Sequence, residues 1–209
     1  MKRRRRLLIP SILVLIGIST LAAAFLYSNE QVTPPVSADF SAKTDDAQTF
    51  DQLLDHAKWQ ALTHNTFILT FNEEQISSWM SLEGKNYADR HGYSFPFQNI
   101  QVGLDDGRMT FYGEASVSDL TLPMQVVIKP GINDNGHLVF DVESAQLGQL
   151  GVPEFLLKSV RRQIDELLTK PFRDIGGDFY IVPGSLSIQD DVFSVQGQLR
   201  EGRVRPTIR

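Results

Sequence analysis

Paired aspartates stand at two places where they could act as the acid and base of a hydrolase. The pairs are Asp105-Asp106 and Asp190-Asp191. Two carboxylates flanking the scissile bond are the usual machinery of glycoside hydrolysis. Each pair, however, separates two stretches of alternating apolar residues. Aspartate in that position is typical of a hairpin turn, because its side chain bonds to the local backbone, so we expect two turns and no catalysis.

Histidines and one Asn/Asp-rich loop are the candidates for metal binding. The histidines are His56, His64, His91 and His137. They form no His-Glu-x-x-His pair, and the fold would have to gather them to make a shared site. Aligning Gly136 of the loop with the glycine of a calcium loop puts Gly131 and Val142 at the outer ligand positions, where carboxylates are required. The chain also lacks cysteine, which excludes disulfides, thiolate metal sites and a cysteine nucleophile.

Phosphate and nucleic-acid chemistry is also poorly supported. The chain has no glycine-rich phosphate loop and no Gly-x-Ser-x-Gly elbow. The formal net charge is -5, but five of the 20 basic residues precede the first acidic residue, Glu30. The remainder carries 15 basic against 25 acidic residues. An acidic body does not attract phosphate backbones, so the sequence predicts no nucleic-acid partner. Because none of these catalytic and phosphate-binding motifs is present, it also predicts no cofactor and no catalytic residue.

The first 27 residues predict a membrane-targeting segment. Residues 7–27 are an uncharged run of 21 residues rich in Leu, Ile, Val and Ala, long enough to cross a bilayer core of about 30 Å. The basic residues 1–6 precede it, so the positive-inside rule places the N-terminus in the cytosol and the rest of the chain outside. Ala22-Ala23-Ala24 leaves a cleaved secretory signal as the alternative. We favour an uncleaved, single-pass anchor, because the apolar run continues to Tyr27.

The remaining chain divides into a tether and one domain. Residues 28–44 contain Pro34-Pro35 and lack apolar periodicity, which is typical of an extended tether. Residues 45–209 are the size of one extracytoplasmic domain. Helical spacing predicts a helix over residues 45–62, and alternation predicts a strand over residues 66–71.

The next part of the domain predicts a capped helix, a loop and then a sheet. Asn72, with Gln75 three residues later, predicts a helix that begins with a capping box. An aromatic loop is expected over residues 87–99. Beyond it the apolar period changes to two, and hairpins are predicted over residues 100–113, 124–145 and 186–197. An α+β class with an antiparallel sheet follows.

Residues 153–172 predict a long amphipathic helix, which Pro153 opens. Its apolar stripe includes Phe155, Leu156, Val160, Ile164 and Leu167. The stripe either packs as ordinary core or borders a groove that accepts acyl chains. Arg161-Arg162 lie on the other side of the helix, where we expect them to be solvated.

The order of motifs carries a family resemblance over about residues 67–199. After the basic N-terminus and single apolar span come the hairpin Ile-x-Val-x-Leu-Asp-Asp-Gly-x-Met-x-Phe-x-Gly from Ile100, a second hairpin ending in Ala145-Gln146-Leu147-Gly148, and Val152-Pro153 opening the helix. This order resembles the YpmS-like family of bacterial membrane-anchored extracytoplasmic proteins, with a look of LmeA-like and tubular lipid-binding modules. One departure is Glu154, where the family pattern leads us to expect an apolar residue.

The resemblance implies a function as well as a fold. The implied fold is a curved antiparallel sheet wrapped around the long amphipathic helix, with lipid in the interior and no catalytic residues. The stripe from Phe155 to Leu167 matches that pattern. We therefore expect a membrane-anchored cell-envelope protein that binds lipid or another long apolar ligand. The alternatives are a non-lipid module that binds other envelope proteins and, less favoured, an envelope hydrolase.

Overall fold

The structure, a computed structural model, describes residues 40–90, 92, 97–117, 120–148, 150–152, 161, 168 and 179–199. The elements in order are α2 (Thr44–His64), β1 (Thr66–Asn72), α3 (Glu73–Leu82), α4 (Gly84–Arg90), β2 (Phe97–Asp105), β3 (Arg108–Val117), β4 (Leu120–Ile132), β5 (Leu138–Leu147), β6 (Leu150–Gly151), β7 (Phe179–Ile181), β8 (Ser187–Gln189) and β9 (Val192–Leu199). Every strand pair among them is antiparallel. The predicted α+β class with antiparallel sheets is confirmed.

The predicted membrane segment lies outside the described residues. This applies to residues 1–6, to the span 7–27 and to most of the tether, 28–44. Within the part of the chain that is described, no helix is both long and apolar enough to cross a bilayer. The first described helix, α2, begins at Thr44, next to the predicted start of the domain.

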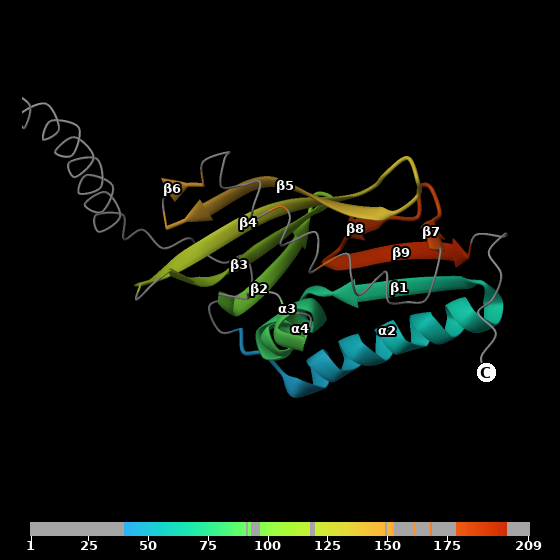
Figure 1. Cartoon of the computed structure of the whole chain (residues 1–209), viewed down its shortest axis with the longest axis horizontal. Coiled ribbons are helices and arrows are strands. Elements are labelled where there is room, and N and C mark those ends of the chain that lie inside the picture. Colours follow the sequence, from blue (N-terminus) through green and yellow to red (C-terminus); the bar gives the residue numbers. More distant parts are fainter. Residues whose placement is uncertain are drawn as a thin grey trace, which may run out of the picture.

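Two antiparallel sheets form the body of the domain (Figure 1). The five-stranded sheet has the order β2-β3-β4-β5-β6, and the second sheet, here the β1–β9 sheet, has the order β1-β9-β7 with β8 also paired to β9. The predicted hairpins are confirmed by pairs such as Leu104 with Met109 and Gln189 with Val192. The β1–β9 pair joins the two ends of the domain.

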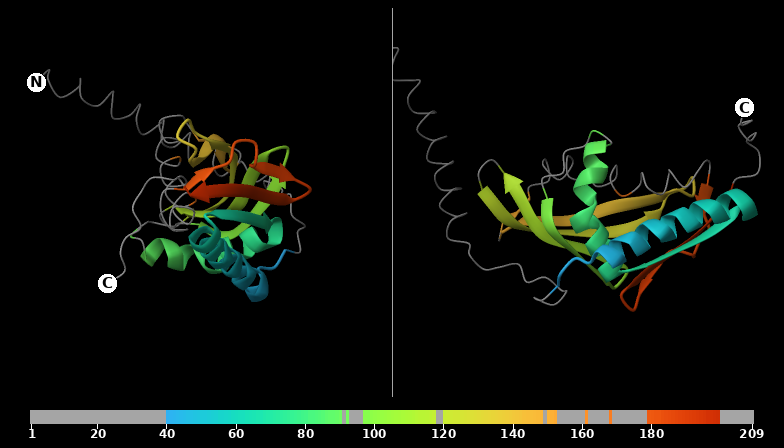
Figure 2. Two further views of the ribbon diagram at one scale, coloured as in Figure 1. Left: turned by 90° about the vertical axis from the view of Figure 1, so that its right-hand side faces the viewer. Right: turned by 90° about the horizontal axis from the view of Figure 1, so that it is seen from below.

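The five-stranded sheet is visibly twisted and bent (Figure 2). Irregularities interrupt two of its ladders, between Gln98 and Gln101 in β2 and between Val127 and Ile128 in β4. An extra residue in one strand of an antiparallel pair bends that strand and increases its twist. The two irregularities are therefore a local cause of the curvature.

Helix α2 packs its apolar side against β1 and α3. Its buried residues recur at helical spacing and are Ala47, Phe50, Leu54, Ala57 and Ala61. The ring of Phe50 stacks on Phe71 of β1, with ring centroids 4.2 Å apart. Leu62, the last residue of the predicted helix, is 71% exposed. One residue turns a helix by about 100°, so Leu62 points well away from its buried neighbour Ala61.

Helix α3 begins at the predicted capping box. The Asn72 side chain accepts a hydrogen bond from the Gln75 backbone N–H at 2.9 Å, and the Gln75 side chain accepts one from the Asn72 N–H at 3.1 Å. Three apolar residues at helical spacing, Ile76, Trp79 and Met80, are buried. The capping box determines where the helix starts, and the buried apolar residues determine which side of it faces the core.

The loop expected over residues 87–99 is wrong at its start, because α4 extends to Arg90. The Tyr87 N–H bonds to the Glu83 carbonyl at 2.8 Å, so the turn of helix continues past Gly84. Tyr87 is buried, and its ring lies edge-on to Trp79 at 5.5 Å. Most helical stability in proteins comes from packing of this kind, which outweighs the low helix propensity of one glycine.

Side chains of α3 seal the free edge of β2. The bonded pairs, helix residue first, are Glu73 with Leu104, Ser77 with Val102, and Ser81 with Ile100. Four residues span about 6 Å of helix, and two residues span nearly the same length of strand. Every fourth helix residue therefore meets every second strand residue. These bonds satisfy backbone groups that an edge strand would otherwise leave unpaired.

Candidate functional site

The predicted ligand-binding residues lie outside the described residues. They are Phe155, Leu156, Val160, Ile164 and Leu167. Of the predicted long helix, the structure describes Arg161 and Leu168, and both are helical. Leu168 is partly buried and packs against the hydrophobic core.

Arg161 is not simply solvated, which corrects the expectation for it. It is half-buried, and its Nε and Nη2 donate to the Val142 carbonyl of β5 at 3.3 and 3.1 Å. The helical pattern placed this arginine on the polar side of its helix. It could not show that a strand carbonyl lies within reach of so long a side chain. The contact ties the helical residue to β5.

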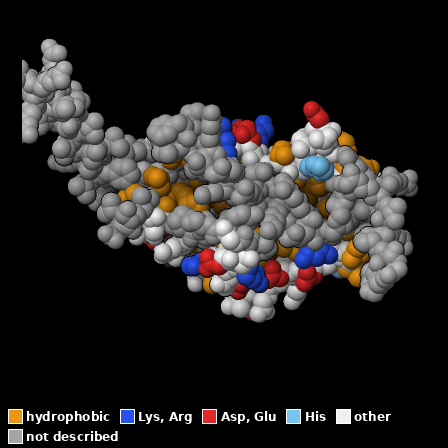
Figure 3. All heavy atoms as spheres, in the orientation of Figure 1, with side chains coloured by type: hydrophobic (Ala, Val, Ile, Leu, Met, Phe, Trp, Pro, Cys, Tyr) orange, Lys and Arg blue, Asp and Glu red, His pale blue; other side chains and the backbone are white. Residues whose placement is uncertain are grey.

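Apolar side chains fill one face of the five-stranded sheet across its four long strands. One cross-strand row is Val102, Phe111, Val126 and Ala145, and the next is Leu104, Met109, Ile128 and Val142. All of these residues are buried. Among the described helices, α3 makes the extensive contact with this sheet, and makes it at β2. Figure 3 shows hydrophobic side chains (orange) between the undescribed grey atoms, and charged side chains along the lower edge, where the helices lie.

The hairpin turns predicted at the two aspartate pairs are present, although Asp105 is itself the last residue of β2 and only Asp106 of that pair lies in the turn. In the β2–β3 turn the φ angles are 48° at Asp106 and 73° at Gly107, and in the β8–β9 turn they are 51° at Asp190 and 62° at Asp191. Two-residue hairpin turns of this kind need positive φ at both central positions. Aspartate tolerates that conformation better than most residues.

The two turns meet at the start of α3, which the sequence did not indicate. Glu73 bonds to the Leu104 N–H and lies close enough to Asp105 and Asp191 to feel their charges. Burial, the largest influence, raises the pKa of the Glu73 carboxyl, the neighbouring carboxylates raise it further, and the Leu104 N–H opposes them. Within the described residues, no group of three or more His, Cys, Asp or Glu side chains could hold a metal ion.

This environment predicts a pH dependence that Glu73→Gln should remove. A carboxyl whose pKa is raised by folding binds its proton more tightly in the folded state. Its contribution to stability is fully present below about pH 4.5, the ordinary value, and is lost as the pH rises through the raised pKa. Urea unfolding of the parent across this window should therefore show a fall in the free energy of unfolding that Glu73→Gln lacks. The comparison variant is Glu74→Gln, next along α3 and exposed; its charge is one of the lesser causes of the raised pKa of Glu73, so in this variant the fall should persist in a reduced form. Parallel curves for the parent and Glu73→Gln would contradict the assignment.

His56 and His64 flank an exposed tryptophan near the C-terminal end of α2. The ring of His56 stacks on Trp59 at 5.9 Å, and His64 meets Trp59 edge-on at 5.3 Å. Trp59 is 54% exposed. Thr63 Oγ1 lies 2.8 Å from His64 Nδ1, which leaves Nε2 as the ring nitrogen without a partner among the described residues. His91 lies outside the described residues.

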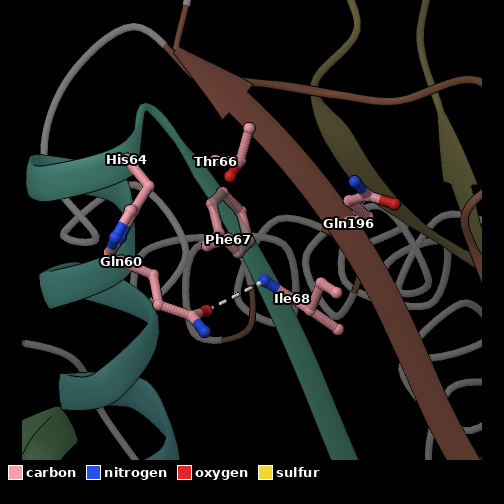
Figure 4. A pocket seen from close by; sticks show the side chains of 6 residues that line it. All are labelled: Gln60, His64, Thr66, Phe67, Ile68 and Gln196. Atoms are coloured by element: carbon pink, nitrogen blue, oxygen red, sulfur yellow. Dashed lines mark hydrogen bonds between the residues drawn. The ribbon is translucent and has the colours of Figure 1, made fainter.

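A pocket of about 300 Å³ lies beside this cluster, between the end of α2 and the β1–β9 pair (Figure 4). Its lining residues are Gln60, His64, Thr66, Phe67, Ile68 and Gln196. Ile68 and Gln196 are directly opposite in the ladder, and Gln60 Oε1 accepts a hydrogen bond from the Ile68 N–H at 3.2 Å. No pattern in the sequence indicated this pocket, because its residues come from the end of a helix and from two strands, β1 and β9, at opposite ends of the domain sequence.

The described residues thus offer two features that bear on ligand binding. One is the buried apolar face of the five-stranded sheet, and the other is the small pocket beside α2, whose described lining has no Lys, Arg, Asp or Glu. No family model, curated protein or solved structure matches the chain.

Proposed function

We propose that the chain is a membrane-anchored cell-envelope protein whose outer domain binds lipid or another long apolar molecule. Residues 7–27 anchor it, residues 1–6 are cytoplasmic, and the folded domain is extracytoplasmic. In this proposal the curved five-stranded sheet wraps around the long helix, and the apolar stripe from Phe155 to Leu167 borders the ligand. The function is binding and includes no catalytic step.

The observation that carries the proposal is the size of the apolar face. β5 has 10 residues, so the face is about 33 Å long, and four strands make it about 14 Å wide. Ligand sites for apolar molecules are lined mainly by hydrophobic side chains with few polar groups. The rows through Phe111 and Met109 have that composition.

Contacts at Arg161 and Leu168 support the place of the long helix. The two residues are seven apart, which is about two helical turns, so they project from similar sides of a helix. One bonds to β5 and the other packs on the core. In the proposal, one helix contains both residues and runs along the sheet.

Photo-crosslinking in the membrane tests the proposal with the full chain. Phe111→p-benzoylphenylalanine places the probe on the apolar face, and Tyr112→p-benzoylphenylalanine, one residue on, places it on the opposite face of β3. We expect a lipid adduct at residue 111, found by mass spectrometry of the tryptic peptide, and none at residue 112. Equal lipid adducts at both positions would indicate contact with the bilayer surface. Adducts at residue 111 only with the chain itself would indicate a packed core and contradict the proposal.

A further inference from the structure

The pocket beside α2 presents polar groups that have no partner among the described residues. Among the described residues, neither the Thr66 hydroxyl nor the side-chain amide of Gln196 makes a hydrogen bond. The Oε1 atom of Gln60 accepts a hydrogen bond from the Ile68 N–H, and the Nε2 group of Gln60 has no hydrogen-bond partner among the described residues. With His64 Nε2, four hydrogen-bonding groups belong to residues that line one space of about 300 Å³ (Figure 4). A few polar groups in the lining of a concavity are the usual means by which a site orients a ligand.

The backbone under these groups is held in place. The Ser185 hydroxyl bonds to both the N–H and the carbonyl of Gln196, at 3.2 and 3.0 Å, and the Val182 N–H donates to the same carbonyl at 2.9 Å. On the neighbouring strand β1, the N–H of Ile68 donates a hydrogen bond to the side chain of Gln60 from α2. A ligand would therefore meet a site whose backbone is already ordered, which lowers the entropic cost of binding.

The chemistry of the lining selects a neutral ligand rich in hydroxyl groups. None of the described lining residues is Lys, Arg, Asp or Glu, so none of these residues can form a Lys, Arg or carboxylate ion pair with a charged group. Amides and a hydroxyl both donate and accept hydrogen bonds, as sugar hydroxyls do. Ile68 is 58% exposed and Trp59, in edge contact with His64, is 54% exposed, which adds apolar surface for the C–H face of a ring. We propose that this pocket binds a sugar unit of an uncharged glycan.

A peptide added as a strand along β1 fits the pocket less well. Strand addition depends on backbone N–H groups at the free edge of a sheet. At the pocket, the Ile68 N–H is already taken by Gln60. Recognition there must come from side chains, which favours a saccharide. α2 has 21 residues, so the pocket lies about 30 Å from the tethered end of that helix, and the site does not depend on lipid binding by the sheet.

Calorimetric titration of the full chain in detergent micelles tests the proposal. The probes are chitotetraose, maltotetraose and mannotetraose, with N-acetyl-tetra-alanine amide as the peptide probe. We expect saturable binding of at least one saccharide with a change in the emission of Trp59, and no binding of the peptide. Gln196→Leu and Thr66→Val each remove one polar group without adding bulk, and each should weaken saccharide binding by about tenfold, the value of one hydrogen bond.

The matched control is Gln189→Leu, the same substitution at an exposed position of β8, which should leave saccharide affinity unchanged. Circular dichroism of each variant separates loss of binding from loss of fold. The proposal is overturned if no saccharide binds, if both pocket variants retain parental affinity while folded, or if the peptide alone binds. Lipid crosslinking at residue 111 is a separate measurement, so failure of either proposal is distinguishable from failure of the other.

Discussion

Gly197→Ala should lower the free energy of unfolding by about 3 kcal/mol, at the upper end of the usual cost of overpacking a core. Gly197 in β9 lies directly opposite Phe67 in β1. A Cβ at residue 197 would stand 2.2 Å from Phe67 Cε1 and 2.3 Å from Cζ. The Phe67 ring is only 2% exposed, so it has no room to swing into solvent. Urea denaturation followed by far-UV circular dichroism measures the loss.

Two comparisons show whether the ring contact is the cause. Gly151→Ala, where an added Cβ meets nothing within 4 Å, should change stability by less than about 0.5 kcal/mol. Phe67→Leu removes part of the ring, so the double variant Phe67→Leu/Gly197→Ala should lose less than the sum of the single variants. Additive losses would show that the contact with Phe67 does not explain the effect.

Ser77→Ala should lower the free energy of unfolding by about 2 kcal/mol, because it removes a hydrogen bond between α3 and the edge strand β2. Ser77 Oγ accepts a hydrogen bond from the Val102 N–H at 2.8 Å, and both residues are 0% exposed. Removal of the hydroxyl leaves a buried N–H with no partner and no access to water, which costs about 1 to 3 kcal/mol. Chemical denaturation gives the total loss. Hydrogen exchange of the Val102 amide should accelerate more than that of the Val126 amide in the centre of the same sheet.

Ser81→Ala provides the matched control on the same helix face. Ser81 Oγ donates to the Ile100 carbonyl at 2.6 Å in a part-buried position. A carbonyl that water can reach loses less when its partner is removed, so this variant should cost about 1 kcal/mol. If Ser77→Ala and Ser81→Ala cost the same, or if exchange at Val102 is unchanged, the buried N–H is not the source of the loss.

Local features of the fold were predictable because short-range chemistry decides them. The capping box at Asn72 needs two side chains three residues apart. The turns at Asp106-Gly107 and Asp190-Asp191 need residues that tolerate positive φ between alternating strands. Both signals lie within a few residues of the structure they specify. The helix α4 was missed for the opposite reason, since burial of Tyr87 against Trp79 stabilises it and is not visible in its own sequence.

The candidate site was less predictable, because its parts are distant in sequence. The pocket needs Gln60, Thr66 and Gln196 in one place, and the pairing of β1 with β9 brings them together. The same pairing places the ring of Phe67 against Gly197, where it leaves no room for a larger side chain. One long-range strand pair therefore determines both this packing contact and the candidate ligand site. No periodicity in either segment names its partner strand.

What the sequence by itself determined is the α+β class, the antiparallel hairpins, the α3 cap and the excess of acidic over basic residues after residue 6. These follow from residue type and spacing within a few residues, or from composition. Only the tertiary structure decided that α3 closes the edge of β2, that the two aspartate turns meet at Glu73, and that Arg161 holds a carbonyl of β5. The physical reason is that a side chain's hydrogen-bond partner and burial depend on which distant segment packs beside it. The local sequence pattern does not specify that segment.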